Sequence, residues 1–470
     1  MLTFFDRDEW GSRRDFLRVG GSVAVGAAGL TMAHVAALRA RAEGRAAPGL
    51  LTGKSVIFLF LHGGPSQFET FDPKMDRPEG IRSATGEVAT SLPGVTFGGS
   101  FPRLAARAHR LTVVRSFVPG DANHDLKPLV GRDTFGANLG CVYARVAGAN
   151  HAETGLPSNV VLFPRAVDAT TRPATSSFGR FQATGPLSAS DAPYDPSDSA
   201  PGAGDLKLAI PRERLDDRRR LLARLDGLAR RLDGARAVDG VDRLRDQAYR
   251  LLDGGLADAF DLAREDPRTL ARYDTAPLVR GEAIRTVWNN HKNYLDNAKS
   301  LGKLLLLARR LCERGAGFVT VTTNFVWDMH ADANNATMVE GMGYMGPPLD
   351  HALSAFVDDL YARGLDEKIL LVACGEMGRT PRINAKGGRD HWGPLGPLLL
   401  VGGGLPGGRV VGRSSRDGAE PQSAPVTGQH LCATVLHTLF DVGLLRLVED
   451  LPREFGQTMA SWAPIPGLSG

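Results

Sequence analysis

The feature that most constrains the fold is a series of short, almost wholly apolar runs spread along the chain. Such a run suits a strand buried on both faces, as in a parallel sheet, whereas a half-exposed strand would alternate apolar and polar residues. The runs cover residues 54–61, 111–114, 159–163, 318–321, 369–374 and 397–401. Helical patterns lie between several of them, and this alternation indicates an α/β fold with a largely parallel sheet.

Size and composition narrow the class of protein. The chain has 470 residues, of which 43% are hydrophobic and 23% charged, enough for a large core in one domain or two. A net charge of +4 and the lack of a basic stripe argue against nucleic-acid binding. The four cysteines are widely spaced and form no C-x-x-C pair, so we expect buried thiols rather than disulfides or a redox motif.

The N-terminus has the order of an export signal. The sequence SRRDFLR at residues 12–18 precedes a Gly/Ala-rich apolar run at 19–38. A possible signal-cleavage site, Ala40-Arg41-Ala42, follows the run. This order predicts a twin-arginine signal within residues 1–47, the translocase as a partner during export, and a periplasmic or extracellular protein with no stable transmembrane span after cleavage. A retained membrane anchor is the alternative, and the glycines of the run make it the weaker one.

The rest of the chain divides into segments that differ in amino-acid composition. We expect residues 48–205 and 301–470 to form two parts of one α/β domain, with a charged helical region at 206–300 inserted between them. Residues 165–204 are rich in Ser, Thr, Pro and Asp and read as a long surface excursion. Leucines at helical spacing among dense opposite charges at 211–272 predict a solvated helical hairpin, or alternatively a partner-binding coiled coil. A long helix at about 281–314 would lead back into the sheet.

Polar clusters follow two of the apolar runs, those at 318–321 and 369–374, and a third cluster comes shortly after the second. They are WDMH at 327–330, GEMGR at 375–379 and GRDHW at 388–392. Ligands of open α/β sheets bind beyond the carboxyl ends of the strands, where these clusters would lie. Asp328 and His330 alternate along an extended segment and would share one face. Singly, each Asp or His also suits a helix cap or a loop hydrogen bond, but their grouping favours a site.

The residue types in these clusters suit a divalent cation. Carboxylate and imidazole together serve zinc well, with manganese, calcium or magnesium as alternatives. We expect Asp390 to orient His391 and Arg379 to hold an anion. The predicted metal ligands are Asp328, His330, Glu376 and His391.

Two further segments would face the same crevice. His62 follows the first apolar run and is a candidate for substrate binding, while Ser116 and His124 follow the second run and are candidates for catalysis. Ser116 equally suits a helix cap, and His124 a turn. The chain has no G-x-S-x-G elbow, Walker loop or dinucleotide fingerprint, so serine esterase, NTPase and dehydrogenase functions lack their motifs.

At these residues the sequence resembles the exported bacterial family called domain of unknown function 1501, itself similar to the alkaline phosphatase and sulfatase superfamily. The motifs that carry the resemblance include FLFLHGGPSQFETFDPK, WDMH, CGEMGRTPRINAKGGRDHWGP and GAEPQSAPVT. The resemblance implies a three-layer α/β/α alkaline-phosphatase-like sandwich with a mostly parallel central sheet. It also implies metal-assisted hydrolysis or transfer of phosphate or sulfate esters.

The sequence departs from the superfamily at several positions. Asp328 and His330 resemble its Asp/His metal pair at closer spacing, and His391 resembles its last metal histidine. His62 stands where a metal-binding Asp is expected, and Glu376 stands where an Asp-His pair is expected. The nucleophile has no clear counterpart, although Ser116 and His124 fall in the right region.

We therefore expect an exported metal-dependent hydrolase acting on a phosphate or sulfate ester of a small molecule or polysaccharide. The alternative is a non-catalytic secreted binding or scaffold protein that keeps the fold. The missing first-strand Asp and the lack of a clear nucleophile favour that alternative.

Overall fold

The computed structural model describes residues 49–197, 214, 217 and 256–468. The chain divides into two units, Met1–Leu51 and Thr52–Gly470, and the fold below is that of the second. The predicted export signal and most of the predicted charged hairpin lie outside the described residues. Within the described ranges, no helix has both the length and the apolar character that a membrane span requires.

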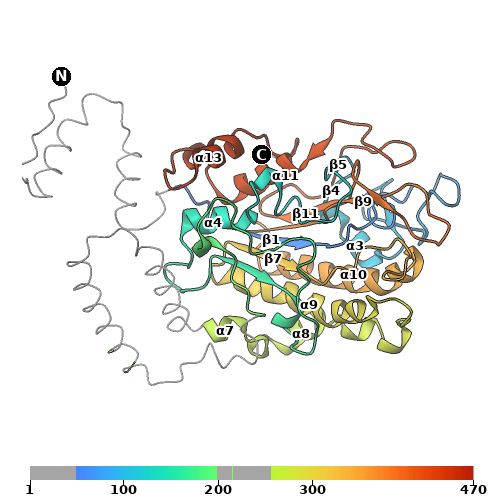
Figure 1. Ribbon diagram of the computed structural model, residues 1–470, viewed down its shortest axis with the longest axis horizontal. Helices are drawn as coiled ribbons and strands as arrows, with labels where there is room; N and C mark the ends of the chain where they lie inside the picture. The colour runs from blue at the N-terminus through green and yellow to red at the C-terminus, as the bar shows by residue number, and fades with distance from the viewer. Residues whose placement is uncertain (1–48, 198–213, 215–216, 218–255, 469–470) are drawn as a thin grey trace, which may run out of the picture. The chain divides into compact units, whose positions relative to one another are not determined.

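A seven-stranded sheet forms the centre of the fold (Figure 1). Every strand in it runs in the same direction except β11, which is antiparallel to both β8 and β4. The mostly parallel sheet predicted from the sequence is thus confirmed. In spatial order its strands are β12 (Arg409–Val411), β4 (Thr112–Val114), β11 (Leu398–Gly402), β8 (Ile369–Cys374), β1 (Ser55–Phe60), β7 (Phe318–Thr322) and β6 (Asn159–Leu162).

Three adjacent parallel strands, β8, β1 and β7, end at one level. Every residue of β1, β7 and β8 is buried, as expected of strands covered on both faces. In the register of the sheet, Phe60 of β1 pairs with Thr322 of β7 and with Cys374 of β8. The segments that follow the three strands therefore start side by side at the carboxyl edge of the sheet.

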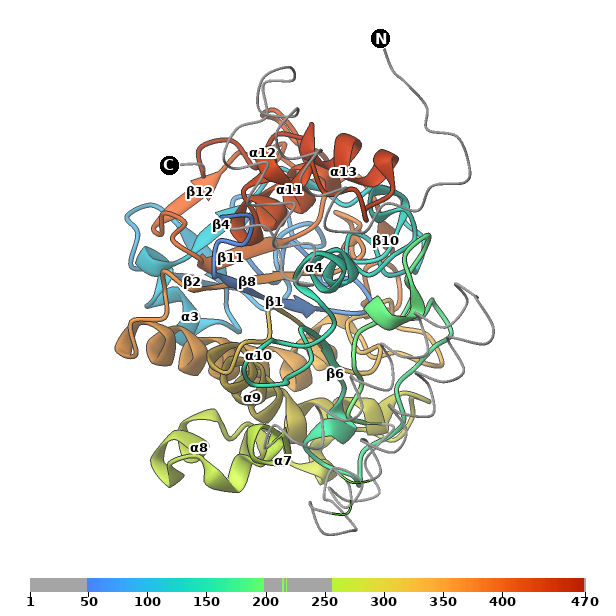
Figure 2. The ribbon, with the colours of Figure 1, turned by 90° about the vertical axis from the view of Figure 1, so that its left-hand side faces the viewer.

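Helices cover both faces of the sheet (Figures 1 and 2). On one face, α9 (His291–Glu313) packs on β7 and β1, and α10 (Met338–Ala362) packs along α9. On the other face, α11 (Gly428–Leu439) packs on β1, and α4 (Leu139–Ala147) packs on β6 and β7. The predicted three-layer α/β/α architecture is confirmed.

The long helix expected at about 281–314 begins later, at His291. The backbone N–H groups of Asn289 and Asn290 donate to the carbonyls of Ala333 and Asn334 instead of to preceding helical carbonyls. Trp288 is buried at the same point. Contacts with a distant loop thus replace the first turns of the helix.

The remaining elements are short. The strands are β2 (Glu87–Ala89), β3 (Thr96–Gly98), β5 (Phe117–Val118), β9 (Gly378–Arg379), β10 (His391–Trp392) and β13 (Val426–Thr427). The α-helices are α3 (Pro102–Ala105), α7 (Leu256–Phe260), α8 (Pro267–Tyr273), α12 (Val442–Leu445) and α13 (Arg453–Ala460). The 3-10 helices are η1 (Ala108–Arg110), η2 (Arg132–Thr134), η3 (Pro164–Ala166), η4 (Ala189–Asp191), η6 (Leu262–Arg264), η7 (Ala276–Leu278) and η8 (Gly281–Ala283).

Buried ion pairs fasten the segment around α7 and α8 to the domain. Arg309 of α9 lies 2.9 Å from Glu265, which precedes α8, and 3.1 Å from Asp359 of α10. Arg310 donates to the same Glu265 at 2.9 Å. We call these residues, together with Glu313 and Arg363, the arginine network.

Candidate metal centre

Three side chains from distant parts of the sequence meet at the carboxyl edge of the sheet. They are His124, Asp328 and His391, and one ligand atom from each lies within 4.8 Å of the others. The His391 Nε2 atom is 3.1 Å from Asp328 Oδ1, and the His124 Nε2 atom is 3.5 Å from the same oxygen. We call these three residues the metal triad. Among the described residues, they are the one such group of histidine and carboxylate donors.

Local structure explains how each member reaches the triad. Asp328 lies in the segment that follows β7, and the β9–β10 hairpin pairs His391 with Arg379. His124 comes from the loop after β5, which Lys127 fastens by bonds to Asp121 at 2.8 Å and to the carbonyl of Asn123 at 2.9 Å.

Asp328 is the centre of the triad and is held from all sides. Arg379 donates to its Oδ1 at 2.7 Å, and Asn335 donates to its Oδ2 at 2.9 Å. Burial by itself would raise the pKa of Asp328, but Arg379 and the neighbouring imidazoles hold this pKa far below its usual range. The carboxylate is therefore ionised at neutral pH.

His330 lies beside the triad. Its Nε2 atom is 2.9 Å from Asp328 Oδ2, and its ring centroid is 5.4 Å from that of His391. The contact with Asp328 raises the pKa of His330. Sequence reasoning expected the Asp328–His330 pair, and the structure brings the two side chains together on one face.

Glu376 stands behind His124. Its carboxylate is fully buried, accepts the Gly63 N–H at 3.0 Å, and lies 2.9 Å from His124 Nδ1. The bond at Nδ1 leaves Nε2 of His124 directed at Asp328. Burial lowers the pKa of His124, but Asp328 and Glu376 together raise it by more. The structure thus places Glu376, predicted as a ligand, against the far nitrogen of a triad histidine.

Arg379 is wholly enclosed by protein acceptors. Its guanidinium donates to Asp328, to the carbonyls of Gly63 and Gly64, and at 3.2 Å to the carbonyl of Arg389. The side chain has no exposed surface. The predicted anion-binding residue instead ties Asp328 to the turn after β1, and an anion would have to displace those acceptors.

His62, predicted to bind substrate, is buried among phenylalanine rings. It lies edge-on to Phe325 at 5.0 Å and to Phe181 at 5.9 Å between ring centroids. Its Nε2 atom has no hydrogen-bond partner among the described residues. Burial lowers the pKa of His62 even though Glu376 opposes the shift, so the imidazole is neutral.

Two other predicted residues make different contacts. Ser116 is fully buried, and its Oγ would lie 2.1 Å from a Cβ atom added to Gly412. The exposed Asp390 accepts a hydrogen bond from Asn384 at 2.9 Å. Among the described residues, no hydrogen bond links Ser116 to the triad or the Asp390 carboxylate to His391. The catalytic and orienting roles given to these residues stay predictions.

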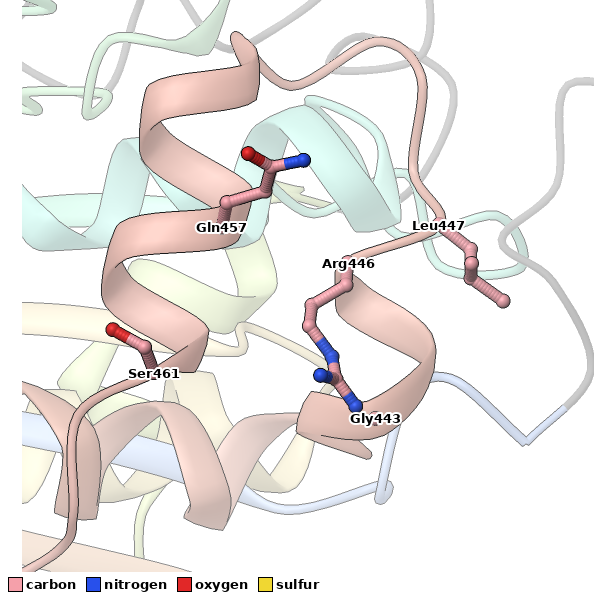
Figure 3. A pocket seen from close by; sticks show the side chains of 5 residues that line it. All are labelled: Gly443, Arg446, Leu447, Gln457 and Ser461. Atoms are coloured by element: carbon pink, nitrogen blue, oxygen red, sulfur yellow. The ribbon is translucent and has the colours of Figure 1, made fainter.

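The triad opens to solvent on its histidine side. The side chains of His391 and His124 are 33% and 13% exposed, whereas those of Asp328 and Glu376 are 4% and 0% exposed. A hollow of about 520 Å³ lies elsewhere, between α12 and α13 (Figure 3). Its lining residues are Gly443, Arg446, Leu447, Gln457 and Ser461, and none of these is a predicted site residue.

Comparison with known proteins gives one family and several distant structures. The model of the family described as "Protein of unknown function (DUF1501)" matches residues 53–443. No curated protein matches the sequence. The chain is similar to the sulfatase PsFucS1 from Pseudoalteromonas sp., with 12% identity over 93% of this chain and 76% of that one, at a TM-score of 0.38. It is also similar to the lipoteichoic acid synthase LtaP from Listeria monocytogenes, with 8% identity over 82% and 72% of the two chains, at a TM-score of 0.27.

Proposed function

Since the chain belongs to the DUF1501 family of proteins of unknown function, its family name supplies no reaction, and we propose one from the site. The protein is an exported metal-dependent hydrolase of phosphate or sulfate esters, and His124, Asp328 and His391 hold its divalent cation. The observation that carries this proposal is the convergence of the three donor atoms within 4.8 Å.

The donor set fits a divalent cation, with zinc as the first candidate. Two imidazoles and one carboxylate are a known ligand set of catalytic zinc sites, in which a further position stays open. Asp328 is ionised, and the partly exposed side chain of His391 places an open position on the solvent side. When bound, the cation would supply a Lewis acid that polarises the ester and activates water at neutral pH.

The surrounding side chains hold the ligands in place. Glu376, at 2.9 Å from His124 Nδ1, favours the tautomer that carries its proton there and leaves the Nε2 lone pair free. Arg379 and Asn335 each fix one oxygen of Asp328. His330 is also partly exposed and lies next to Asp328, so we propose that its imidazole exchanges a proton with the leaving group or solvent.

Water is the proposed nucleophile. Ser116 is fully buried and packs against Gly412, and no hydrogen bond joins it to the triad among the described residues. Direct attack by water needs no covalent intermediate on the protein.

A second function has its own support. The guanidinium of Arg379 is fully buried and donates to protein acceptors, which an ester anion would have to displace. This observation favours a secreted binding or scaffold protein in which the triad holds a structural ion.

Two measurements test the proposal and separate it from the alternative. We expect elemental analysis of the purified protein to find about one bound cation per chain, lost in His391→Ala and kept in the matched control His437→Ala on the exposed side of α11. We then expect turnover of aryl phosphates or sulfates with zinc, manganese, calcium or magnesium. A bound cation without turnover of any ester supports the scaffold, and a wild-type protein that binds no cation rules out both.

Export rests on the residues before the domain and has a separate test. Replacing Arg13 and Arg14 together by Lys should leave the protein in the cytoplasmic fraction, because the translocase receptor reads the arginine pair. Unchanged fractionation of the double variant would contradict the proposed pathway.

A further inference from the structure

A phenylalanine from the predicted surface excursion lies against the metal triad. Phe178 is half-buried, while its neighbours Ser177 and Gly179 are exposed. Its ring stacks on Phe325, with centroids 4.4 Å apart and an interplanar angle of 28°. Both rings contact His124, at 5.0 Å and 4.6 Å between centroids. We call Phe178 and Phe325 the aromatic wall.

The segment that carries Phe178 is anchored beside the triad. Asn324, which follows β7 and precedes Phe325, accepts the Thr175 N–H at 3.1 Å. The Asn324 side-chain amide donates to the carbonyl of Pro173 at 3.0 Å. One residue thus fixes the excursion to the same edge of the sheet that supplies Asp328.

The Phe178 side chain stays partly exposed although its ring packs on Phe325 and His62, and the residues on both sides of it in the sequence are exposed. An apolar ring that stays partly in water gains only part of the free energy of burial. The ring also borders a proposed metal ligand, His124.

We propose that the aromatic wall is a subsite for a flat ring in the substrate, either an aryl group or the apolar face of a sugar ring. This inference rests on the proposed function, since the ester anion would bind at the triad and its next group would meet the wall. Aromatic faces recognise such rings by stacking and dispersion. Asn324 is a positioning residue that acts through the segment bearing Phe178.

The test measures binding to the zinc-loaded full-length protein by calorimetry. The probes are phenyl phosphate, glucose 1-phosphate and methyl phosphate, together with the three matching sulfates, so that each set shares its anion and differs in the attached group. The variants are Phe178→Ala and Asn324→Ala, with Ser177→Ala as the matched control on the same segment.

In the wild type we expect a ring-bearing ester to bind about tenfold more tightly than the methyl ester of the same anion. Phe178→Ala should bring the affinities of the ring-bearing and methyl esters of one anion to the same value, Asn324→Ala should lose part of the preference, and Ser177→Ala should keep it. The phenyl and glucosyl probes distinguish an aryl group from a sugar.

Equal binding of the three esters of one anion in the wild type would overturn the ring subsite and leave the metal hydrolase standing. A ring preference that survives in Phe178→Ala would also overturn it, because the wall would not be its source. Failure of every ester to bind the zinc-loaded wild type would overturn the subsite together with the proposed function.

Discussion

The protein has two clusters of charged and titratable side chains around buried carboxylates, and they differ in the groups that contact those carboxylates. In the arginine network, Glu265 and Asp359 contact the guanidiniums of Arg309 and its neighbours. In the metal triad, Asp328 contacts one guanidinium, that of Arg379, and three imidazoles. A guanidinium keeps its protons and has no lone pair for a metal, whereas a neutral imidazole carries a lone pair on one ring nitrogen that can bind a cation. Buried charge alone therefore does not mark a functional site.

The clusters also differ in position and access. The arginine network joins α9, α10 and the segment before α8, and its central residues Arg309 and Asp359 are each 2% exposed. The metal triad lies beyond the carboxyl end of β7 and at the start of β10, and its histidines reach solvent. Ion pairs that are buried from solvent stabilise the packing of helices, while a cluster with solvent-accessible side chains leaves room for a ligand.

The largest expected effect on stability comes from removing Arg309, the central residue of the arginine network. Arg309→Ala should lower the free energy of unfolding by about 3 kcal/mol, because Glu265 and Asp359 both lose a buried partner although they keep Arg310 and Arg363. Urea denaturation measures this loss, with the exposed Arg382→Ala as control. Metal content should stay at the wild-type value, and its loss would show that the two clusters are coupled.

Removing a triad histidine should change metal binding strongly and stability little, the reverse of Arg309→Ala. His391→Ala should abolish metal binding yet change the stability of the metal-free protein by less than about 1 kcal/mol, because the side chain is partly exposed. Elemental analysis and denaturation of the same preparation give both values. Stability lost to the same extent as in Arg309→Ala would make the triad a second structural network.

A smaller effect is expected behind the triad. Glu376→Gln keeps the shape and an acceptor for Gly63 but removes the negative charge beside His124 Nδ1. We expect metal affinity to fall about tenfold, near the lower end of the effect of losing such a partner of a ligand. Titration with zinc against a chelator measures the change. An unchanged affinity would contradict the role of Glu376 in supporting His124 as a metal ligand.

The smallest effect concerns a carboxylate that has no cationic side chain in hydrogen-bond contact within the part of the chain that the structure describes. Asp350 accepts the backbone N–H groups of Arg103 at 3.1 Å and Leu104 at 2.7 Å, and burial raises its pKa to about 6. The folded state then binds more protons than the unfolded state between about pH 4 and 6, so stability should fall as the pH rises through this window. For Asp328, whose pKa is lowered, the metal-free protein should lose stability on acidification instead.

Denaturation of Asp350→Asn across this pH range checks the sign. The variant cannot ionise at this position and should lack the part of the fall in stability that Asp350 causes. A wild-type stability that rises steadily from pH 4 to 6, with no difference from the variant in slope, would contradict the raised pKa.

The sequence by itself determined the strands and the edge of the sheet where the site lies. Each predicted run became a strand, because burial on both faces leaves a local apolar pattern that needs no knowledge of the partner strand. The strand β12 was missed, since Arg409–Val411 is short and only partly buried. Asp328, His330 and His391 were predicted to meet for the same reason, as parallel strands end together.

Only the tertiary structure decided which side chains face one another at that edge. It brought His124 to Asp328 with Glu376 behind it, enclosed Arg379 in carbonyl groups, directed Asp390 to Asn384, and laid Phe178 on His124. These contacts join loops that lie far apart in the sequence. The direction of a loop side chain depends on hydrogen bonds and packing with distant segments. The local periodicity of the sequence does not predict these contacts.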